Sequence, residues 1–188
     1  YNALAAIGFG VSENMDVEEI KKALGKAERI KGRFQRVSWQ GEFDVFVDYA
    51  HTPQALEMLL GFLKGMAPGR LITVFGCGGD RDRSKRPVMG KISAVESDFT
   101  FITSDNPRSE DPAQITSEIE SGFKNLGKSN YKIVIDRKEA IREAITGARK
   151  GDIVAIAGKG HENYQVFKDT VIPFDDYEVV SEMLKNLP

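Results

Sequence analysis

The sequence predicts an α/β fold, a doubly wound, mostly parallel sheet with helices on both faces. From residue 43 onward, short runs of β-branched and aromatic residues alternate with stretches in which apolar residues recur at helical spacing. The runs are apolar at consecutive positions, which is typical of strands buried on both faces of a parallel sheet. With 188 residues, of which 41% are hydrophobic, the chain can bury one ample core.

Strands and helices are expected to alternate along this region. The expected strands are Phe43–Val47, Leu71–Phe75, Asp98–Thr103, Tyr131–Ile135 and Ile153–Ala157. The expected helices cover approximately residues 53–65, 86–96, 112–126, 137–149 and 176–186. Parallel strands that alternate with helices are joined by right-handed crossovers. Two further runs, Tyr164–Phe167 and Val171–Phe174, predict an antiparallel ribbon at the edge of the sheet.

The beginning of the chain predicts a pair of helices. Residues 1–10 are mostly small and apolar, which predicts a buried helix that lacks its start. Asp16 followed three residues later by Glu19 is typical of a capping box and predicts a second helix that ends near Ala27. Because the chain opens at Tyr1 without an initiator methionine, we expect it to be a fragment of a longer protein.

A change of pattern near residue 32 predicts a domain boundary. Val37–Trp39 and Phe43–Val47 are short alternating runs joined at Gln40-Gly41, which is a hairpin signal. We therefore assign residues 1–31 to the end of one domain and residues 32–188 to a second one.

The composition excludes several classes of protein. The 26 lysines and arginines nearly balance the 28 aspartates and glutamates, and the net charge of -2 leaves no global basic field to hold nucleic acid or an anionic membrane. The sequence has no apolar run of about 18 residues and does not open with a basic stretch followed by an apolar segment, which argues against a transmembrane helix and a secretory signal. The single cysteine, Cys77, excludes an internal disulfide and argues against a structural zinc site. We expect a soluble cytoplasmic protein.

Charged and glycine-rich segments follow four of the expected strands. They are Asp48–Pro53, Gly76–Arg83, Ser104–Arg108 and Gly158–Glu162. The carboxyl ends of parallel strands meet at one edge of a sheet, and open α/β sheets bind ligands in the crevice beyond that edge. For any one of these loops alone, an ordinary solvated turn is as good an explanation as a ligand site. It does not explain all four loops together. We therefore expect a ligand site at this edge.

Two other motif matches fail in their context. Residues 122–129 fit the Walker A pattern, but a working phosphate loop follows a strand and opens a helix, whereas this stretch closes a helix and precedes a strand. Gly127 is better explained as a helix C-cap and Lys128 as a solvated side chain. The Gly76-Cys77-Gly78 loop has Arg81 where a dinucleotide fingerprint has its third glycine, which argues against NAD binding.

The loop side chains match a ligand that carries both carboxylates and amines. Arg81 and Arg108 can each bind a carboxylate through two hydrogen bonds, and Asp105 and Glu162 can accept hydrogen bonds from an ammonium group. An amino acid has this combination of groups. Pro107 fixes its own φ and favours an extended residue before it, which holds the arginine after it in one direction.

Each charged side chain also has an ordinary structural interpretation. Arg81 and Arg83 can form a salt-bridged surface loop with Asp80 and Asp82. His51 alone is typical of a histidine at a helix start. The functional interpretation therefore depends on the loops acting together.

The order of the loop motifs resembles the carboxy-terminal part of the Mur ligases. The matching segments are Asp48–Pro53, Phe75–Asp82, Asp105–Arg108 and Gly158–Glu162. The resemblance covers essentially the whole chain, with residues 1–31 similar to the end of the central ATPase domain. It implies an ATP- and Mg²⁺-dependent ligase of peptidoglycan synthesis. In that reaction, phosphorylation makes the carboxylate of UDP-MurNAc-L-Ala-D-Glu an acyl donor, and the amine of meso-diaminopimelate attacks it.

The resemblance also implies that several parts of such a ligase lie before Tyr1. These are the phosphate-binding loop, the carbamylated lysine that helps to hold Mg²⁺, and the domain that binds the UDP moiety. We therefore expect the chain alone not to catalyse ligation, and we assign no metal ligand and no catalytic residue within it.

Roles for single residues also follow from the resemblance. It implies contacts to meso-diaminopimelate from Arg81, Asn106, Arg108, Gly158 and Glu162, with Asp105 and Pro107 in the same motif. It implies contacts to ATP from Asn2, Arg33, Asp48 and His51. Arg108 is the selective residue, because the distal carboxylate of meso-diaminopimelate attracts a guanidinium, whereas the side chain of L-lysine brings a like charge. No role is assigned to Lys159 or His161.

Other functions remain open. A ligase that adds L-lysine is opposed by Arg108. A non-catalytic domain that binds amino acids or nucleotides, descended from such a ligase, is favoured if the full-length gene lacks the phosphate-binding segment. An α/β oxidoreductase that uses the Gly76 loop would bind NAD, which we do not expect.

Overall fold

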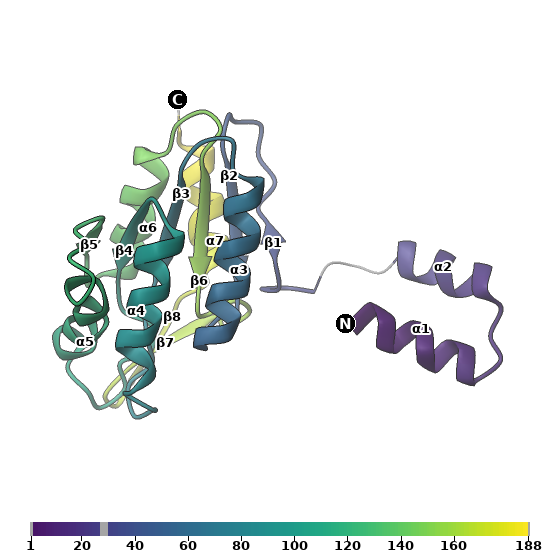
Figure 1. Ribbon diagram of the computed structural model, residues 1–188, viewed down its shortest axis with the longest axis horizontal. Coiled ribbons are helices and arrows are strands. Elements are labelled where there is room, and N and C mark those ends of the chain that lie inside the picture. The colour runs from purple at the N-terminus through teal and green to yellow at the C-terminus, as the bar shows by residue number, and fades with distance from the viewer. Residues whose placement is uncertain (1, 27–29, 188) are drawn as a thin grey trace. The chain divides into compact units, whose positions relative to one another are not determined.

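The computed structural model describes residues 2–26 and 30–187, without the side chain of Asn2 (Figure 1). The predicted helix end at Ala27 and the first residue, Tyr1, lie outside the described residues. The chain divides into two compact units, Tyr1–Ile30 and Lys31–Pro188, which are described separately. That the first unit is the end of an ATPase domain stays a prediction.

The first unit is a pair of helices, α1 (Asn2–Ser12) and α2 (Val17–Gly25). Asp16 caps α2, as predicted, by accepting hydrogen bonds from two backbone amides of the first turn. The expected burial of α1 is wrong, since Leu4 is 67% and Phe9 66% exposed. Two short helices share only one narrow interface, which leaves most of the apolar surface of α1 uncovered.

The second unit is a six-stranded, mostly parallel sheet (Figure 1). Its strands are β1 (Gln35–Arg36), β2 (Asp44–Asp48), β3 (Leu71–Phe75), β4 (Phe99–Ile102), β5 (Tyr131–Ile133) and β6 (Ile153–Ala157), in the spatial order β1-β2-β6-β3-β4-β5. Only β1 is antiparallel to its neighbour. The central strands β3 and β6 are buried at every position, as their continuous apolar runs predict.

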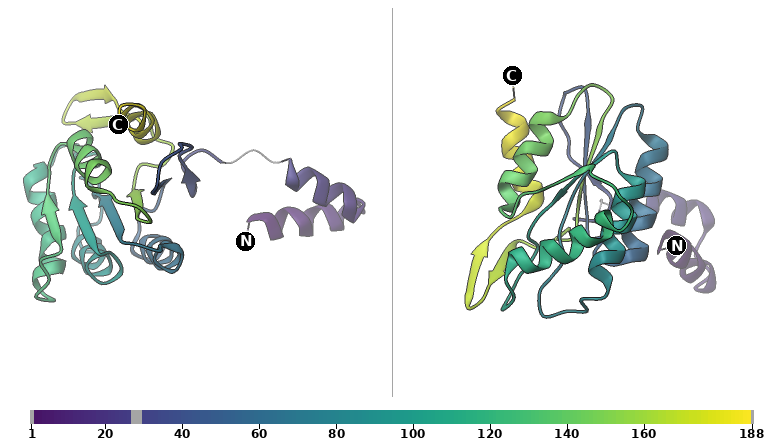
Figure 2. Two further views of the ribbon diagram at one scale, coloured as in Figure 1. Left: turned by 90° about the horizontal axis from the view of Figure 1, so that it is seen from above. Right: turned by 60° about the vertical axis from the view of Figure 1, so that its left-hand side comes forward.

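Helices cover both faces of this sheet (Figure 2). They are α3 (Pro53–Met66), α4 (Lys85–Glu96), α5 (Pro112–Lys124), α6 (Arg137–Gly147) and α7 (Asp176–Lys185). Leu56, Met89 and Ile119 pack α3, α4 and α5 against one face, and Ile141 and Val180 pack α6 and α7 against the other. The doubly wound α/β prediction is confirmed, with element bounds that differ by at most two residues. None of the described helices has the length and apolar character needed to cross a membrane.

The predicted hairpin around Gln40-Gly41 is wrong in its position. The strand that pairs with β2 is Gln35–Arg36 rather than Val37–Trp39. The chain leaves the sheet after one further backbone hydrogen bond because Trp39 folds back. Its indole N–H donates to the carbonyl oxygen of Phe43 at 2.9 Å, and the two rings pack with centroids 4.5 Å apart.

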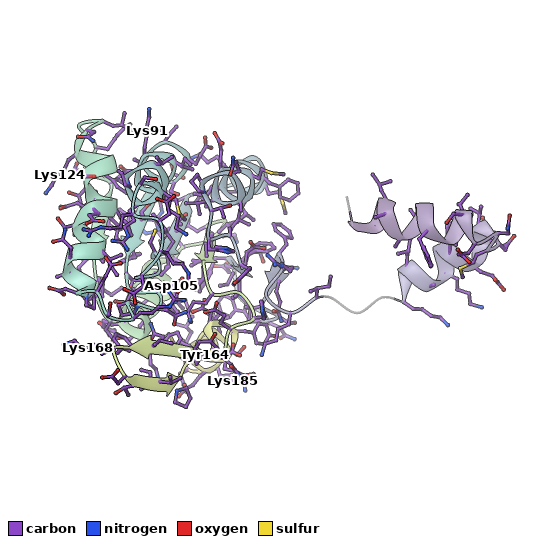
Figure 3. The ribbon with its side chains drawn as sticks, turned by 90° about the horizontal axis from the view of Figure 1, so that it is seen from below. Lys91, Asp105, Lys124, Tyr164, Lys168 and Lys185 are labelled. Carbon is purple, nitrogen blue, oxygen red and sulfur yellow. The ribbon has the colours of Figure 1, made fainter. Side chains whose placement is uncertain are left out.

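The predicted ribbon is present but does not extend the main sheet. Strands β7 (Tyr164–Phe167) and β8 (Thr170–Pro173) form a separate two-stranded antiparallel sheet. Figure 3 shows Tyr164 and Lys168 at the two ends of β7. The ribbon lies against the loop after β4. There the backbone N–H of Arg108 donates to Val166 at 2.9 Å, and that of Lys168 donates to Arg108 at 2.6 Å.

The stretch that fits the Walker A pattern closes helix α5, as predicted. Gly127 has a φ of 63°. Its backbone N–H donates to Lys124, and the N–H of Lys128 donates to Phe123, which is the Schellman arrangement at a helix C-terminus. Carbonyl groups rather than amides are directed to this end of the helix, so no phosphate-binding loop is formed here.

Candidate functional site

The loops after β2, β3, β4 and β6 surround one cavity of about 420 Å³. The predicted residues that line it are Arg81, Asp105, Asn106, Arg108, Gly158, Glu162 and His51. Tyr49, Lys85 and Tyr164 line it as well and were not predicted. The expected meeting of four loops at one edge of the sheet is therefore observed, while the roles of the single residues stay predictions.

Arg108 is held in an uncommon backbone conformation. Its φ is 53°, in the left-handed region, which costs a non-glycine residue about 1 kcal/mol. The two backbone hydrogen bonds with the ribbon β7–β8 stabilise this conformation, and the Nη1 group donates to the carbonyl oxygen of Gly79 at 2.7 Å. The direction of Arg108 is thus set by the ribbon as well as by Pro107, the single cause inferred from the sequence.

Gly79 allows the loop after β3 to approach the loop after β4 closely. A Cβ atom at Gly79 would lie 1.8 Å from the carbonyl oxygen of Pro107, which no side chain can occupy. The backbone N–H of Gly79 donates to the carbonyl oxygen of Asn106 at 2.9 Å. The close approach brings the loop that carries Arg81 beside the loop that carries Arg108.

The salt-bridged loop considered from the sequence is not formed. Asp80 accepts hydrogen bonds from Ser109, and Arg83 pairs with Glu118. Arg81 is exposed, and its guanidinium donates only to the carbonyl oxygen of the preceding residue, at 3.1 Å. Within the described part of the chain, no carboxylate lies within salt-bridge distance of Arg81 or of Arg108. Both guanidinium groups can therefore bind carboxylates of a ligand.

The two carboxylates of the cavity differ in their surroundings. Asp105 is only 7% exposed, and burial raises the pKa of its carboxyl group despite the nearby charges of Arg137 and Lys159. Burial alone would also raise the pKa of Glu162, but hydrogen bonds from Lys159 and Asn106 outweigh it and lower that pKa. Glu162 is therefore ionised at neutral pH and is the better acceptor for a ligand ammonium group.

Two of the residues predicted to contact ATP, Arg33 and His51, belong to an aromatic and cationic cluster around Tyr49. The guanidinium of Arg33 stacks 4.6 Å from the ring centroid of Tyr49. The rings of His51 and His161 pack against the same tyrosine, with centroids 4.4 Å and 4.9 Å away. His51 Nδ1 lies 2.8 Å from the carbonyl oxygen of Tyr49. Flat rings and positive charge together suit a nucleotide, with Tyr49 at the centre.

The other two residues predicted to contact ATP are Asp48, which does not line the cavity, and Asn2. The carboxylate of Asp48 accepts a hydrogen bond from the backbone N–H of Phe34 at 2.6 Å, so it fixes the chain segment that carries Arg33. Asn2 begins α1 in the first unit, and its side chain lies outside the described residues.

Arg137 was missed from the sequence and supports two of the loops. Its side chain is fully buried at the start of α6 and makes two hydrogen bonds to Asp176, both 2.8 Å long. It also donates to the carbonyl oxygens of Ser104 at 3.3 Å and Ala157 at 3.0 Å. These carbonyls directly precede the loop residues Asp105 and Gly158. Arg137 stands three and four residues before Ala140 and Ile141, so it lies on the apolar face of α6. This helical spacing in the sequence could have identified Arg137 as a buried residue.

Arg86, also missed, supports the loop after β3. It is fully buried in α4 and donates to Glu110 and Glu118 at 2.8 Å and to the carbonyl oxygen of Gly78 at 3.2 Å. Glu110 in turn accepts a hydrogen bond from the backbone N–H of Asp80 at 2.7 Å. The hydrogen bonds from Arg86 lower the pKa of Glu110 to about 2. A buried arginine that pairs with two partly exposed glutamates thus holds the loop that carries Arg81.

Over residues 2–26 and 30–187, no three His, Cys, Asp or Glu side chains are grouped so that they could hold a metal ion. The residues of the cavity therefore do not fit a resident Mg²⁺. Glu162 instead pairs with the ammonium of Lys159, and Asp105 lies buried near the charges of Lys159 and Arg137.

Comparison with known proteins relates most of the second unit to one family. The family model described as "Mur ligase, glutamate ligase domain" matches residues 32–160. A UDP-N-acetylmuramoyl-L-alanyl-D-glutamate--2,6-diaminopimelate ligase from Syntrophomonas wolfei is 56% identical over 185 residues, which cover 98% of this chain and 38% of that protein.

Solved structures give the same relation. A structure of a UDP-N-acetylmuramoyl-L-alanyl-D-glutamate--2,6-diaminopimelate ligase superposes with a TM-score of 0.77 and 40% identity over 97% of this chain and 37% of that one. The UDP-N-acetylmuramate-alanine ligase of Thermotoga maritima shares the fold, with 20% identity and a TM-score of 0.68 over 98% of this chain and 36% of that one. The chain thus spans well under half the length of these relatives.

Proposed function

Because the chain belongs to the Mur ligase family, we propose that it is the amino-acid-binding part of an ATP-dependent ligase that joins meso-diaminopimelate to UDP-MurNAc-L-Ala-D-Glu. Such a reaction adds the third residue of the peptidoglycan peptide, and its nucleotide-linked substrate belongs to the cytoplasm. No nucleic acid and no membrane takes part.

The observation that carries this proposal is the charge pattern of the cavity. The guanidinium groups of Arg81 and Arg108, which have no carboxylate partner among the described residues, line the same cavity as the ionised carboxylate of Glu162. Meso-diaminopimelate carries a carboxylate and an amine at each of its two ends. L-Lysine has an amine but no carboxylate at its distal end, so it would leave one guanidinium without a partner.

The residues of this chain would then bind and orient the amino acid. Arg81 and Arg108 would each hold one of its carboxylates, and Glu162 would accept a hydrogen bond from the ammonium of the end that does not react. Holding the attacking amine in place converts an encounter of two molecules into a step within one complex, which lowers the barrier to amide formation. Asn106 and the backbone of Gly158 would complete the contact, while Asp105 and Pro107 shape the loop.

The aromatic and cationic cluster would take the nucleotide. Arg33 and His51 flank Tyr49 and would meet the base, ribose or phosphates of ATP, with Asp48 fixing the segment of Arg33. Mg²⁺ would neutralise phosphate charge in the whole reaction, and no residue of this chain is assigned to it.

Titration of the chain with meso-diaminopimelate and, separately, with L-lysine tests this proposal. We expect the diamino diacid to shift the backbone amide resonances around Arg81, Asn106 and Glu162, and we expect L-lysine to shift them much less. Arg108→Ala should abolish the preference, whereas Arg142→Ala, which removes an exposed arginine of α6, should leave it intact. Equal responses to both ligands, or no response to either at millimolar concentration, would contradict the proposal.

A further inference from the structure

The ammonium of Lys159 is buried beside the cavity. Its side chain is 0% exposed, and its Nζ lies 3.0 Å from Oε2 of Glu162 and 3.2 Å from Oδ1 of Asn106. Nζ also lies 5.6 Å from the ring centroid of Tyr164. Lysine is among the residues least often fully buried, because its charge loses water unless other groups replace it. The site thus retains a costly group for which neither the motifs nor the proposed reaction has a role.

Lys159 determines how Asn106 is oriented. The Oδ1 atom of Asn106 accepts from Lys159 and from the backbone N–H of Val166, the latter at 3.1 Å. Both of these groups can only donate, so this end of the amide must be its oxygen. The Nδ2 group then faces Glu162 and donates to it at 2.7 Å.

The same contacts give hydrogen bonds to one carboxylate oxygen of Glu162 and leave the other without a donor among the described residues. Its Oε2 atom accepts from both Lys159 and Asn106. No donor among residues 2–26 and 30–187 lies within hydrogen-bond distance of its Oε1 atom. A carboxylate with one oxygen fixed and one oxygen open, on a residue that lines the cavity, is arranged to accept a hydrogen bond from a ligand.

Lys159 provides the positive charge in direct contact with Glu162, with its Nζ 3.0 Å from Oε2. The charged or titratable groups that face Glu162 are Lys159 in its own loop, Asp105 and Arg108 after β4, Tyr49 after β2, and Arg137 in α6. Asp105 opposes ionisation of Glu162, as does burial. Among the cations of the described residues, only Lys159 donates a hydrogen bond to the carboxylate of Glu162. Removal of Lys159 would leave a partly buried carboxylate beside a second one.

We propose that Lys159 is a positioning residue that keeps Glu162 ionised with one oxygen open to the cavity, and that it thereby sets the affinity of the site for the amine of an amino acid. Lys159 itself does not touch the ligand. The ligand in this inference rests on the proposed function, but the effect of Lys159 on Glu162 does not.

The first test needs no ligand. The carboxyl ¹³C resonance of Glu162 is followed against pH in the 188-residue chain and in Lys159→Met, which keeps the length and apolar stem of the side chain. We expect the midpoint to lie below the ordinary glutamate value of 4.5 in the unchanged chain, and to rise above it in Lys159→Met. Lys128→Met, which removes an exposed lysine of the stretch that fits the Walker A pattern, should leave the midpoint unchanged.

Two results of this test would overturn the inference. One is a midpoint in Lys159→Met equal to that of the unchanged chain, with a dispersed amide spectrum that shows the variant to be folded. The other is a midpoint at or above the ordinary value in the unchanged chain. The second result can be read even if Lys159→Met fails to fold.

The second test measures binding of meso-diaminopimelate between pH 5 and pH 8. If an ionised Glu162 is needed, Lys159→Met should bind about tenfold more weakly, and the loss should grow as the pH falls. A merely structural role for Lys159 would change affinity without changing its dependence on pH, and that result would refute the inference. Absence of binding to the unchanged chain would instead contradict the proposed function, and the carboxyl titration would still decide the role of Lys159.

Discussion

Replacement of Arg137 by methionine should destabilise the second unit strongly. The change removes two hydrogen bonds to Asp176 and one each to the carbonyl oxygens of Ser104 and Ala157, all inside the protein. Asp176, which is 0% exposed, would then be a buried charge without its partner. Breaking a buried ion pair from one side costs about 3–5 kcal/mol. Since small domains are stable by about 5–15 kcal/mol, we expect a loss of about 4 kcal/mol, a large part of the total.

Urea unfolding followed by tryptophan fluorescence measures this loss. Trp39 is the single tryptophan and lies in the second unit, so the signal reports on that unit. Adding Asp176→Leu to Arg137→Met removes the orphaned charge and should restore at least half of the loss. Arg142→Met, at an exposed ion pair on the same helix, should cost less than about 1 kcal/mol. The reasoning is refuted if Arg137→Met costs less than about 1 kcal/mol, or if the double variant is less stable than the single one.

Three further outcomes are expected. The free energy of unfolding of Arg108→Gly, measured in urea, should lie within about 1 kcal/mol of that of the parent chain, because glycine accepts a φ of 53°. The variant should nevertheless lose the preference for meso-diaminopimelate. A large loss of stability would contradict this expectation. Burial raises the pKa of Cys77 to about 12, so the thiol should resist alkylation by iodoacetamide at pH 8 until urea unfolds the chain, and rapid labelling of the native protein would be inconsistent with the structure. The pKa of Glu110 is lowered to about 2 from 4.5, so its stabilising contribution is present above pH 4.5 and should be lost as the pH falls towards 2; Glu110→Gln should flatten this part of the stability profile.

The sheet and its helices were predictable because their pattern is local. Apolar runs such as Leu71–Phe75 and Ile153–Ala157 have no polar side that could face water, so they indicate buried parallel strands. The meeting of the loops followed from the same topology, since it depends only on which residues come after each strand. The position of β1 was not predictable in this way, because Trp39 removes the chain from the sheet through contacts of its own side chain.

The side chains that support the site could not be predicted from the sequence, for a different reason. Arg86, Arg137 and Lys159 are charged residues, and a sequence indicates that such residues are solvated unless their partners are known. Their partners Glu110, Asp176 and Asn106 are distant in the chain or belong to other elements. The left-handed backbone of Arg108 was equally invisible, because it depends on a ribbon that begins more than fifty residues later.

The most direct test of the central claim is the amino acid that a ligase containing this chain incorporates. The matching part of the Syntrophomonas wolfei relative would be replaced by this chain, and release of phosphate from ATP would be measured with UDP-MurNAc-L-Ala-D-Glu. We predict release that depends on meso-diaminopimelate and is at least about tenfold slower with L-lysine, with Arg108→Ala removing the difference. Equal use of both amino acids by an active chimera would contradict the account.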